Sequence, residues 1–491
     1  MAPLTRRQLV QRVGLGALAA PAFVPLPLRA ISARRRQDRS IEELAALVRR
    51  TPYGELMPEL VRAARAGASY VDLLGGIFLA GVEDIHPRPV GFKLHAVMMV
   101  ESAFLLAEAA APEERLLPVL FNAHRFKTAQ AEDEEEGGWV LPPAPAAQFD
   151  DLAQARAELV RAFEEFDPER GDRAAVGVLR LGGLEALFED LWPYGARDFR
   201  DIGHRIILTA HVFRVLRRLG GRAAEPAVRS LVHGLLCGAD GDTTVPYAAN
   251  VELAAGLGPV RWDGEERPEV SAELLAELRE AAPEGAARAV AGRLEAGVAP
   301  RSLWDGLRLA ASELLLRRPG LLAVHPVTAT NAMHAAWRLA RRDRARILLL
   351  LQAASWLPRY REVLGLAAGD PPAEHRIDVL EAVPVPAEPG GGALEGLFLE
   401  ADERPAHAAR RVLGLGRHGE FVAGARSYLF RKGTGSHHYK YAAAVFEDAG
   451  HTHPRWAARV LAPAVHYLPM AGADDAEVFL RARRALDREG R

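Results

Sequence analysis

Apolar residues recur every three to four positions along most of the chain, which is the spacing of one face of an α-helix. The clearest case is segment 201–219, in which Ile202, Ile206 and Phe213 mark one apolar stripe. A second apolar stripe lies beside the first. We therefore predict that this segment is a helix buried on two sides.

Patterns typical of strands and nucleotide-binding loops are missing. No segment convincingly alternates apolar and polar residues, and alanine, leucine and arginine dominate over β-branched residues. The sequence has no glycine-rich loop between a strand and a helix, so it does not predict a Rossmann or P-loop site. It also has no fixed repeat, so it does not predict a solenoid. We predict an all-α fold: one large, irregular multi-helix domain over 34–491, with possible halves 34–265 and 300–491.

Charge and cysteine content exclude several classes of protein. The 491-residue chain has a net charge of −2 with mixed signs, so we expect no nucleic-acid partner. Cys237 is the single cysteine, which excludes an intramolecular disulfide and argues against a thiolate zinc site. No segment reaches membrane-spanning length without charge, so we expect no stable membrane span in the mature chain.

The first 33 residues have the pattern of a twin-arginine export signal. Arg6 and Arg7 precede an uncharged run over 13–28 and a small-residue stretch over 30–33 that a peptidase could cut. This pattern predicts a bacterial protein that the twin-arginine export machinery delivers to the periplasm or the medium. The alternative is a basic tail or an ordinary first helix.

Histidine is the residue that changes this picture, because its 16 copies cluster on apolar helices. His204 and His211 are seven residues apart in the helix predicted over 201–219, so they differ by about 20° around the axis and about 10 Å along it. A buried imidazole without a partner is costly. The alternative is a pair of hydrogen-bonded core histidines.

Two later segments show the same combination. In segment 323–339, His325 lies near a helix start, and Thr328, Asn331 and His334 follow at helical spacing among apolar residues. In segment 433–450, His437 shares a face with Tyr441. We expect the three histidine helices to meet and their imidazoles to line one cavity.

Other histidine patterns carry less weight. The spacing of His451 and His453 is a known metal-ligand spacing but is weak alone. Glu83 and His86 have the Glu-x-x-His spacing of di-iron bundles, but no second helical copy partners them. His95 lies in an apolar helix, and its offset from Glu101 does not make a helical ligand pair.

The order of these segments resembles the questin oxidase-like family. An early histidine precedes an apolar run (Leu94-His95-Ala96), and a central histidine-x6-histidine helix continues to Arg214. A later helix begins His325-Pro326-Val327-Thr328, and a C-terminal helix carries His437-His438-Tyr439-Lys440. The resemblance covers roughly 85–470 through short motifs. It departs from the family pattern at 206–208 and 329–331.

This resemblance implies an oxidoreductase that inserts oxygen beside the carbonyl of an apolar or aromatic substrate, a Baeyer–Villiger oxidation, with NADPH as a possible electron source. A metal ion is a second possible cofactor. A histidine-ligated metal protein of other chemistry and a helical scaffold without catalysis remain alternatives. The candidate catalytic residues are His204, His211, His325, His334 and His437, and the candidate substrate-binding residues are Thr328, Asn331, Trp337, Tyr439, Tyr441 and His95.

Overall fold

The computed structural model describes residues 40–236, 246–385 and 392–489 and contains helices without any strand in those ranges. The predicted all-α fold is thereby confirmed. Residues Arg39–Arg491 form one compact unit. The predicted export signal at 1–33 lies outside the described residues. None of the described helices has both the length and the apolar character needed to cross a membrane.

We call residues 40–236 the first half of this unit. Its elements are α2 (Ile41–Arg50), α3 (Tyr53–Arg65), α4 (Tyr70–Asp84), the 3-10 turn η2 (Phe92–Leu94), α5 (His95–Glu108), α6 (Leu117–Glu135), α7 (Leu152–Glu165), α8 (Pro168–Gly195), α9 (His204–Arg218) and α10 (Ala224–Leu235).

We call residues 246–489 the second half. Its elements are α11 (Tyr247–Gly256), α12 (Pro268–Glu280), α13 (Pro283–Glu295), α14 (Pro300–Arg317), η3 (Leu322–Val324), α15 (His325–Leu339), α16 (Asp343–Val363), η4 (Ala373–His375), α17 (Gly392–Glu403), α18 (Pro405–Gly414), α19 (His418–Lys432), α20 (Ser436–His451), α21 (Pro454–Leu461), η5 (Ala462–His466) and α22 (Glu477–Arg488).

Local sequence signals set several helix ends. Ser40 and Glu43 form a reciprocal capping box at the start of α2, and Ser69 and Asp72 do the same for α4. The helix predicted over 201–219 is observed as α9, buried along most of its length. It starts only at His204 because Ile202 and Gly203 both adopt left-handed backbone angles (φ 44° and 87°).

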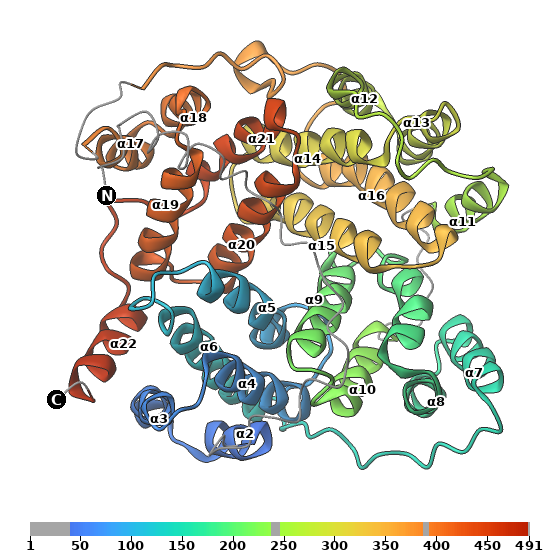
Figure 1. Ribbon diagram of the computed structural model, residues 1–491, viewed down its shortest axis with the longest axis vertical. Coiled ribbons are helices and arrows are strands. Elements are labelled where there is room, and N and C mark those ends of the chain that lie inside the picture. The colour runs from blue at the N-terminus through green and yellow to red at the C-terminus, as the bar shows by residue number, and fades with distance from the viewer. Residues whose placement is uncertain (1–39, 237–245, 386–391, 490–491) are drawn as a thin grey trace, which may run out of the picture. The chain divides into compact units, whose positions relative to one another are not determined.

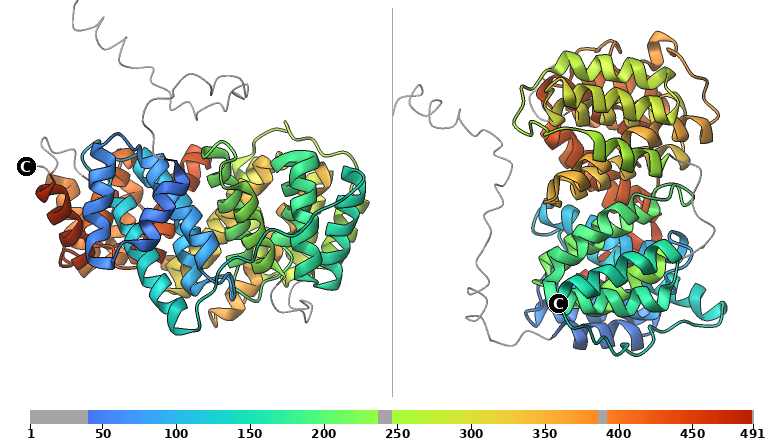
Figure 2. Two further views of the ribbon diagram at one scale, coloured as in Figure 1. Left: turned by 90° about the horizontal axis from the view of Figure 1, so that it is seen from below. Right: turned by 90° about the vertical axis from the view of Figure 1, so that its right-hand side faces the viewer.

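The same packing order occurs in both halves. In the first half α2 packs on α4, α4 packs on α5 and α6, and α3 packs on α6. In the second half α12 packs on α14, α14 packs on α15 and α16, and α13 packs on α16. In the right view of Figure 2 the blue-to-green helices of the first half lie below the yellow and orange helices of the second half.

Four helices, two from each half, meet in a closed ring. α5 packs on α9, α9 on α15, α15 on α20, and α20 on α5 again. They surround the middle of Figure 1. Three of them begin with histidine, and α20 has a histidine at its second position, so the ring brings four imidazoles to the ends of four helices.

Candidate metal centre

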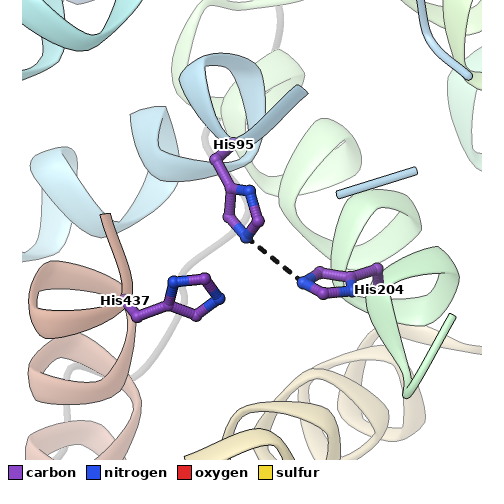
Figure 3. Close-up of side chains that lie close together, drawn as sticks. All are labelled: His95, His204 and His437. Carbon is purple, nitrogen blue, oxygen red and sulfur yellow. Dashed lines mark hydrogen bonds between the residues drawn. The ribbon is translucent and has the colours of Figure 1, made fainter. Parts of the chain in front are cut away.

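His95, His204, His325 and His437 form a closed ring of side chains, which we call the four-histidine centre. Neighbouring ring centroids are 5.0 Å (His95–His204), 4.9 Å (His204–His325), 5.2 Å (His325–His437) and 4.5 Å (His437–His95) apart. Figure 3 shows three of these imidazoles, which point toward one another from α5, α9 and α20. The predicted convergence of the three histidine helices is therefore observed, with α5 as a fourth member.

Glycines with positive φ precede three of these four histidines at the helix starts. Gly91 (φ 120°) precedes η2 and α5, Gly320 (φ 143°) precedes η3 and α15, and Gly203 (φ 87°) directly precedes His204. Such angles are strained for residues with a Cβ. At Gly203 a Cβ would also lie 2.7 Å from the Cβ of Ala329. The backbone therefore needs glycine to deliver the imidazoles.

Backbone carbonyls fix the orientation of three of the four imidazoles. The Nδ1 atoms of His95, His204 and His325 lie 2.7, 2.8 and 3.0 Å from the carbonyl oxygens of Phe92, Asp201 and Leu321, respectively. A carbonyl can only accept, so each Nδ1 carries the proton. Each Nε2 is then left with a free lone pair, the form in which histidine binds a metal.

The lone pairs of His95 and His204 face each other rather than a hydrogen-bond donor. The Nε2 atoms of His95 and His204 are 3.2 Å apart. Nitrogen atoms of His95, His204 and His437 all lie within 4.8 Å of one another. The Nε2 atoms of His325 and His437 are buried without a hydrogen-bond partner. Two nitrogens held at about 2.1 Å by one tetrahedral ion are about 3.4 Å apart, so a shared cation fits this spacing.

The surroundings keep these imidazoles neutral. Burial, followed by the nearby Lys440 ammonium, lowers the pKa of His95 and His204 well below the usual value. The same two causes lower the pKa of His325 to about 4 and that of His437 to about 2. Neutral imidazole is the form that coordinates metals.

A small cavity lies next to the four-histidine centre, with room on the order of one water molecule. It is lined by Ser102, Leu105, His211, Thr328, Asn331, Lys440, Ala443 and Ala444. These side chains come about one to three turns after the four histidines on α5, α9, α15 and α20, so the four helices run in the same direction past the cavity.

The cavity contains groups that can exchange protons. The Nδ1 atom of His211 lies 2.7 Å from the Met98 carbonyl, so its Nε2 is an acceptor. Lys440 is buried, its Nζ has no partner, and burial lowers its pKa to about 7. Lys440 was absent from the site residues expected from sequence, because one lysine among helical residues gives no signal of burial.

A buried polar network, which we call the central network, runs behind the cavity. Arg214 bonds Glu101 (2.9 Å) on one side and Glu447 (2.7 Å) on the other. Asn331 donates to Glu447 (3.1 Å) and to Asp448 (3.0 Å). Its amide nitrogen therefore faces the two acids. The network ties all four helices of the ring together.

Several residues expected at the site lie in other contacts. His334, nine positions after His325 on α15, packs between Trp304 and Trp337. Tyr439 stacks on Phe121, and Tyr441 packs on Tyr467 in the apolar core.

Two loop-side histidines also have local partners. The His451 ring accepts from Arg338, and the Nδ1 of His453 accepts from the Arg455 backbone. Among the described residues, the group of metal-ligating side chains found is His95, His204 and His437.

Geometry therefore defines this chain as an all-α protein with a candidate four-histidine metal centre. No protein-family model matches the chain. No curated protein and no solved structure matches it either.

Proposed function

We propose that this protein is a metal-dependent oxidoreductase in which one transition-metal ion is held by ring nitrogens of His95, His204 and His437, with His325 as the fourth imidazole beside it. The observation that carries the proposal is that four neutral imidazoles converge and that, among the described residues, no hydrogen-bond donor contacts their nitrogen lone pairs. Imidazole-only ligand sets suit iron, copper and zinc.

Oxidation of an apolar or aromatic carbonyl compound is the reaction that we assign to the centre. It follows from the resemblance to the questin oxidase-like family, with NADPH as electron source. The metal would supply oxygen activation and Lewis acidity. His211 Nε2 would accept a proton, and Lys440, with a pKa near 7, would donate or accept one at a substrate oxygen.

Thr328 and Asn331 are the residues best placed to orient a substrate group in the cavity. Both are buried and line it. The Thr328 hydroxyl donates to the Val324 carbonyl at 3.2 Å, so its oxygen lone pairs remain for a ligand. Asn331 donates its amide hydrogens to two acids and so offers its Oδ1 as an acceptor.

A scaffold without a site explains these contacts less well. Burying an imidazole nitrogen without a partner costs about 1–3 kcal/mol, and the centre contains two such atoms, on His325 and His437. A protein selected only for packing would gain stability from apolar residues at these positions.

Metal analysis of the purified protein tests the centre. We expect about one ion of iron, copper or zinc per chain in the wild type and loss of that ion in His95→Ala and His437→Ala. His334→Ala is the matched control, because His334 is also buried and lies outside the centre. Wild-type protein that holds no ion after incubation with these metals would overturn the proposal.

Dioxygen uptake tests the assigned reaction separately. Metal-loaded wild type should consume dioxygen and NADPH together in the presence of an aromatic ketone, and His437→Ala should not. Metal-loaded protein that consumes neither with a series of aromatic ketones would leave a metal-binding protein of other chemistry.

A further inference from the structure

The cavity beside the four-histidine centre is lined by a buried amine that has no partner among the described residues. Lys440 is 2% exposed, and its Nζ makes no hydrogen bond. A buried amine in this state is unfavourable, whereas an apolar side chain of similar shape would avoid the cost. The lysine therefore points to a small ligand that the amine meets in the cavity.

Lys440 and Thr328 are the cavity residues nearest in sequence to the histidines. Lys440 follows His437 by three residues on α20, and Thr328 follows His325 by three residues on α15. Three residues of helix advance the chain by roughly 4.5 Å, a little less than one turn. A ligand that contacts the Lys440 amine thus lies on the order of one helical turn from the four-histidine centre.

The other polar groups of the cavity include several acceptors. The N–H groups of His211 and Asn331 are directed at a backbone carbonyl and at two acids, so Nε2 and Oδ1 remain as acceptors. The Thr328 hydroxyl donates to a backbone carbonyl, so its lone pairs remain as well. An anion would be repelled by these acceptors, and dioxygen would leave them unpaired. The ligand must therefore both donate and accept hydrogen bonds.

The size of the cavity narrows the choice further. Room on the order of one water molecule excludes ring systems and limits the ligand to one or two non-hydrogen atoms. Water meets these conditions but cannot oxidise a ketone. Hydrogen peroxide has two oxygen atoms, donates two hydrogens and accepts through both oxygens, so it meets them as an oxidant.

We propose that this cavity is a binding site for hydrogen peroxide, in which Lys440 donates to a peroxide oxygen and His211 and Asn331 accept the peroxide hydrogens. This inference rests on the proposed function, for which it names the oxygen donor. Hydrogen peroxide is thereby held beside the four-histidine centre, on the cavity side of the four helices.

The oxidation balances with hydrogen peroxide as its second substrate. One peroxide oxygen enters between the carbonyl carbon of the ketone and a neighbouring carbon. The O–O bond and that C–C bond break, two C–O bonds form, and the other oxygen leaves as water with both hydrogens. The reaction that must supply the peroxide is the two-electron reduction of dioxygen, in which NADPH and one proton yield NADP⁺ and hydrogen peroxide.

Crystallography of the metal-free full chain tests the site without turnover. Crystals soaked in hydrogen peroxide should show two bonded oxygens in the cavity, one of them about 2.7–3.2 Å from the Lys440 Nζ. Soaked Lys440→Met crystals should lack them. This variant should unfold at a temperature equal to or above that of the wild type, because it removes an unpaired buried amine. A single water in soaked wild-type crystals would overturn the proposal.

Peroxide-driven oxidation is the second test. Metal-loaded wild type should convert acetophenone and hydrogen peroxide to phenyl acetate without NADPH or dioxygen, and Lys440→Met should lower the rate about tenfold or more. Lys127→Met is the matched control, because Lys127 is also buried but bonds the Arg49 carbonyl (2.7 Å) on α6, outside the cavity. An equal loss of rate in both variants would contradict the role of Lys440.

The peroxide site and the proposed function can fail separately. Two bonded oxygens in the cavity of a protein that oxidises no ketone would support the site and refute the assigned oxidation. Oxidation that requires dioxygen and NADPH, in a protein whose cavity holds only water after soaking, would refute the peroxide site and leave the proposed function standing.

Discussion

The two halves of this protein use one packing plan to supply two histidines each. The first half provides His95 and His204 from α5 and α9, and the second half provides His325 and His437 from α15 and α20. In both halves a glycine with positive φ and a 3-10 turn precede the earlier histidine. The centre therefore forms only where the two halves meet.

The halves differ in the polar residues that follow the histidines. Six residues after the earlier histidine lies Glu101 in the first half and Asn331 in the second. Ten residues after the later one lies Arg214 in the first half and Glu447 in the second. Arg214 bonds both Glu101 and Glu447. Arg214 and Glu447, which occupy equivalent positions, therefore have opposite charges and link the two halves.

The groups suited to proton transfer are also distributed unequally. Three residues after the histidines, the first half has Met98 and Ile207, and the second half has Thr328 and Lys440. Thr328 and Lys440 line the cavity. In the proposed function both halves would ligate the metal, and the second half would contribute the polar side chains one turn after its histidines.

Arg214→Met breaks the junction between the halves and should have the largest effect on stability. It leaves Glu101, which is fully buried, without its closest cation. It also leaves Glu447 with Asn331 as its remaining hydrogen-bond donor among the described residues. Breaking a buried pair in this way costs about 3–5 kcal/mol. Chemical denaturation should report the loss as a lower unfolding midpoint.

Arg222→Met is the control for that experiment. Arg222 pairs with Asp72 near the surface, and such a pair contributes about 0–1 kcal/mol. Equal losses for the two variants would show that the central network does not join the halves.

Helical periodicity predicted the fold class and the helices that bear His204, His325 and His437, because amphipathic spacing is a local property of the sequence. Their convergence was inferred from the cost of burying imidazole. His95, expected among the substrate-binding residues, lies in the ring. His334 was expected at the site and packs between tryptophans. Which turn of a helix faces a cavity depends on neighbours far away in the chain.

The repeated packing plan left no fixed repeat in the sequence for a physical reason. Its equivalent positions carry different side chains: Glu101 corresponds to Asn331, and Arg214 corresponds to Glu447. Because the residues at these positions are complementary rather than identical, the sequence shows no repeat. The export signal and the assigned oxidation remain predictions.

Metal-linked stability tests whether both halves contribute equally to the centre. A ligand at 100 times its dissociation constant stabilises the folded state by about 2.7 kcal/mol, so an added metal should raise the unfolding temperature of the wild type and a chelator should reverse the rise. His204→Ala and His325→Ala, one from each half, should lose most of this shift. If the metal-induced rise in unfolding temperature survives in one variant, the half that carries that substitution does not hold the metal.

Glu447 and Asp448 are adjacent buried acids whose contributions to the free energy of unfolding should respond oppositely to pH. Glu447 pairs across the two halves, whereas Asp448 pairs within the second half. Arg214 lowers the pKa of Glu447 to about 2 despite its burial, and burial raises the pKa of Asp448 to about 6. Ionised Glu447 therefore stabilises the fold above pH 4.5, and this contribution is lost as pH falls toward 2. Ionising Asp448 is unfavourable, so its contribution is lost as pH rises from about 4 to 6.

Glu447→Gln should therefore lower the free energy of unfolding by roughly 2 kcal/mol at pH 7, and the deficit should shrink at acidic pH. Asp448→Asn should be neutral or stabilising at pH 7, because Asp448 accepts from Asn331 and Arg308 through one oxygen, which asparagine retains. Denaturant titrations of both variants between pH 4 and 8 measure these differences. Parallel pH profiles for the two variants would mean that Arg214 does not single out Glu447, and the junction between the halves would then lie elsewhere.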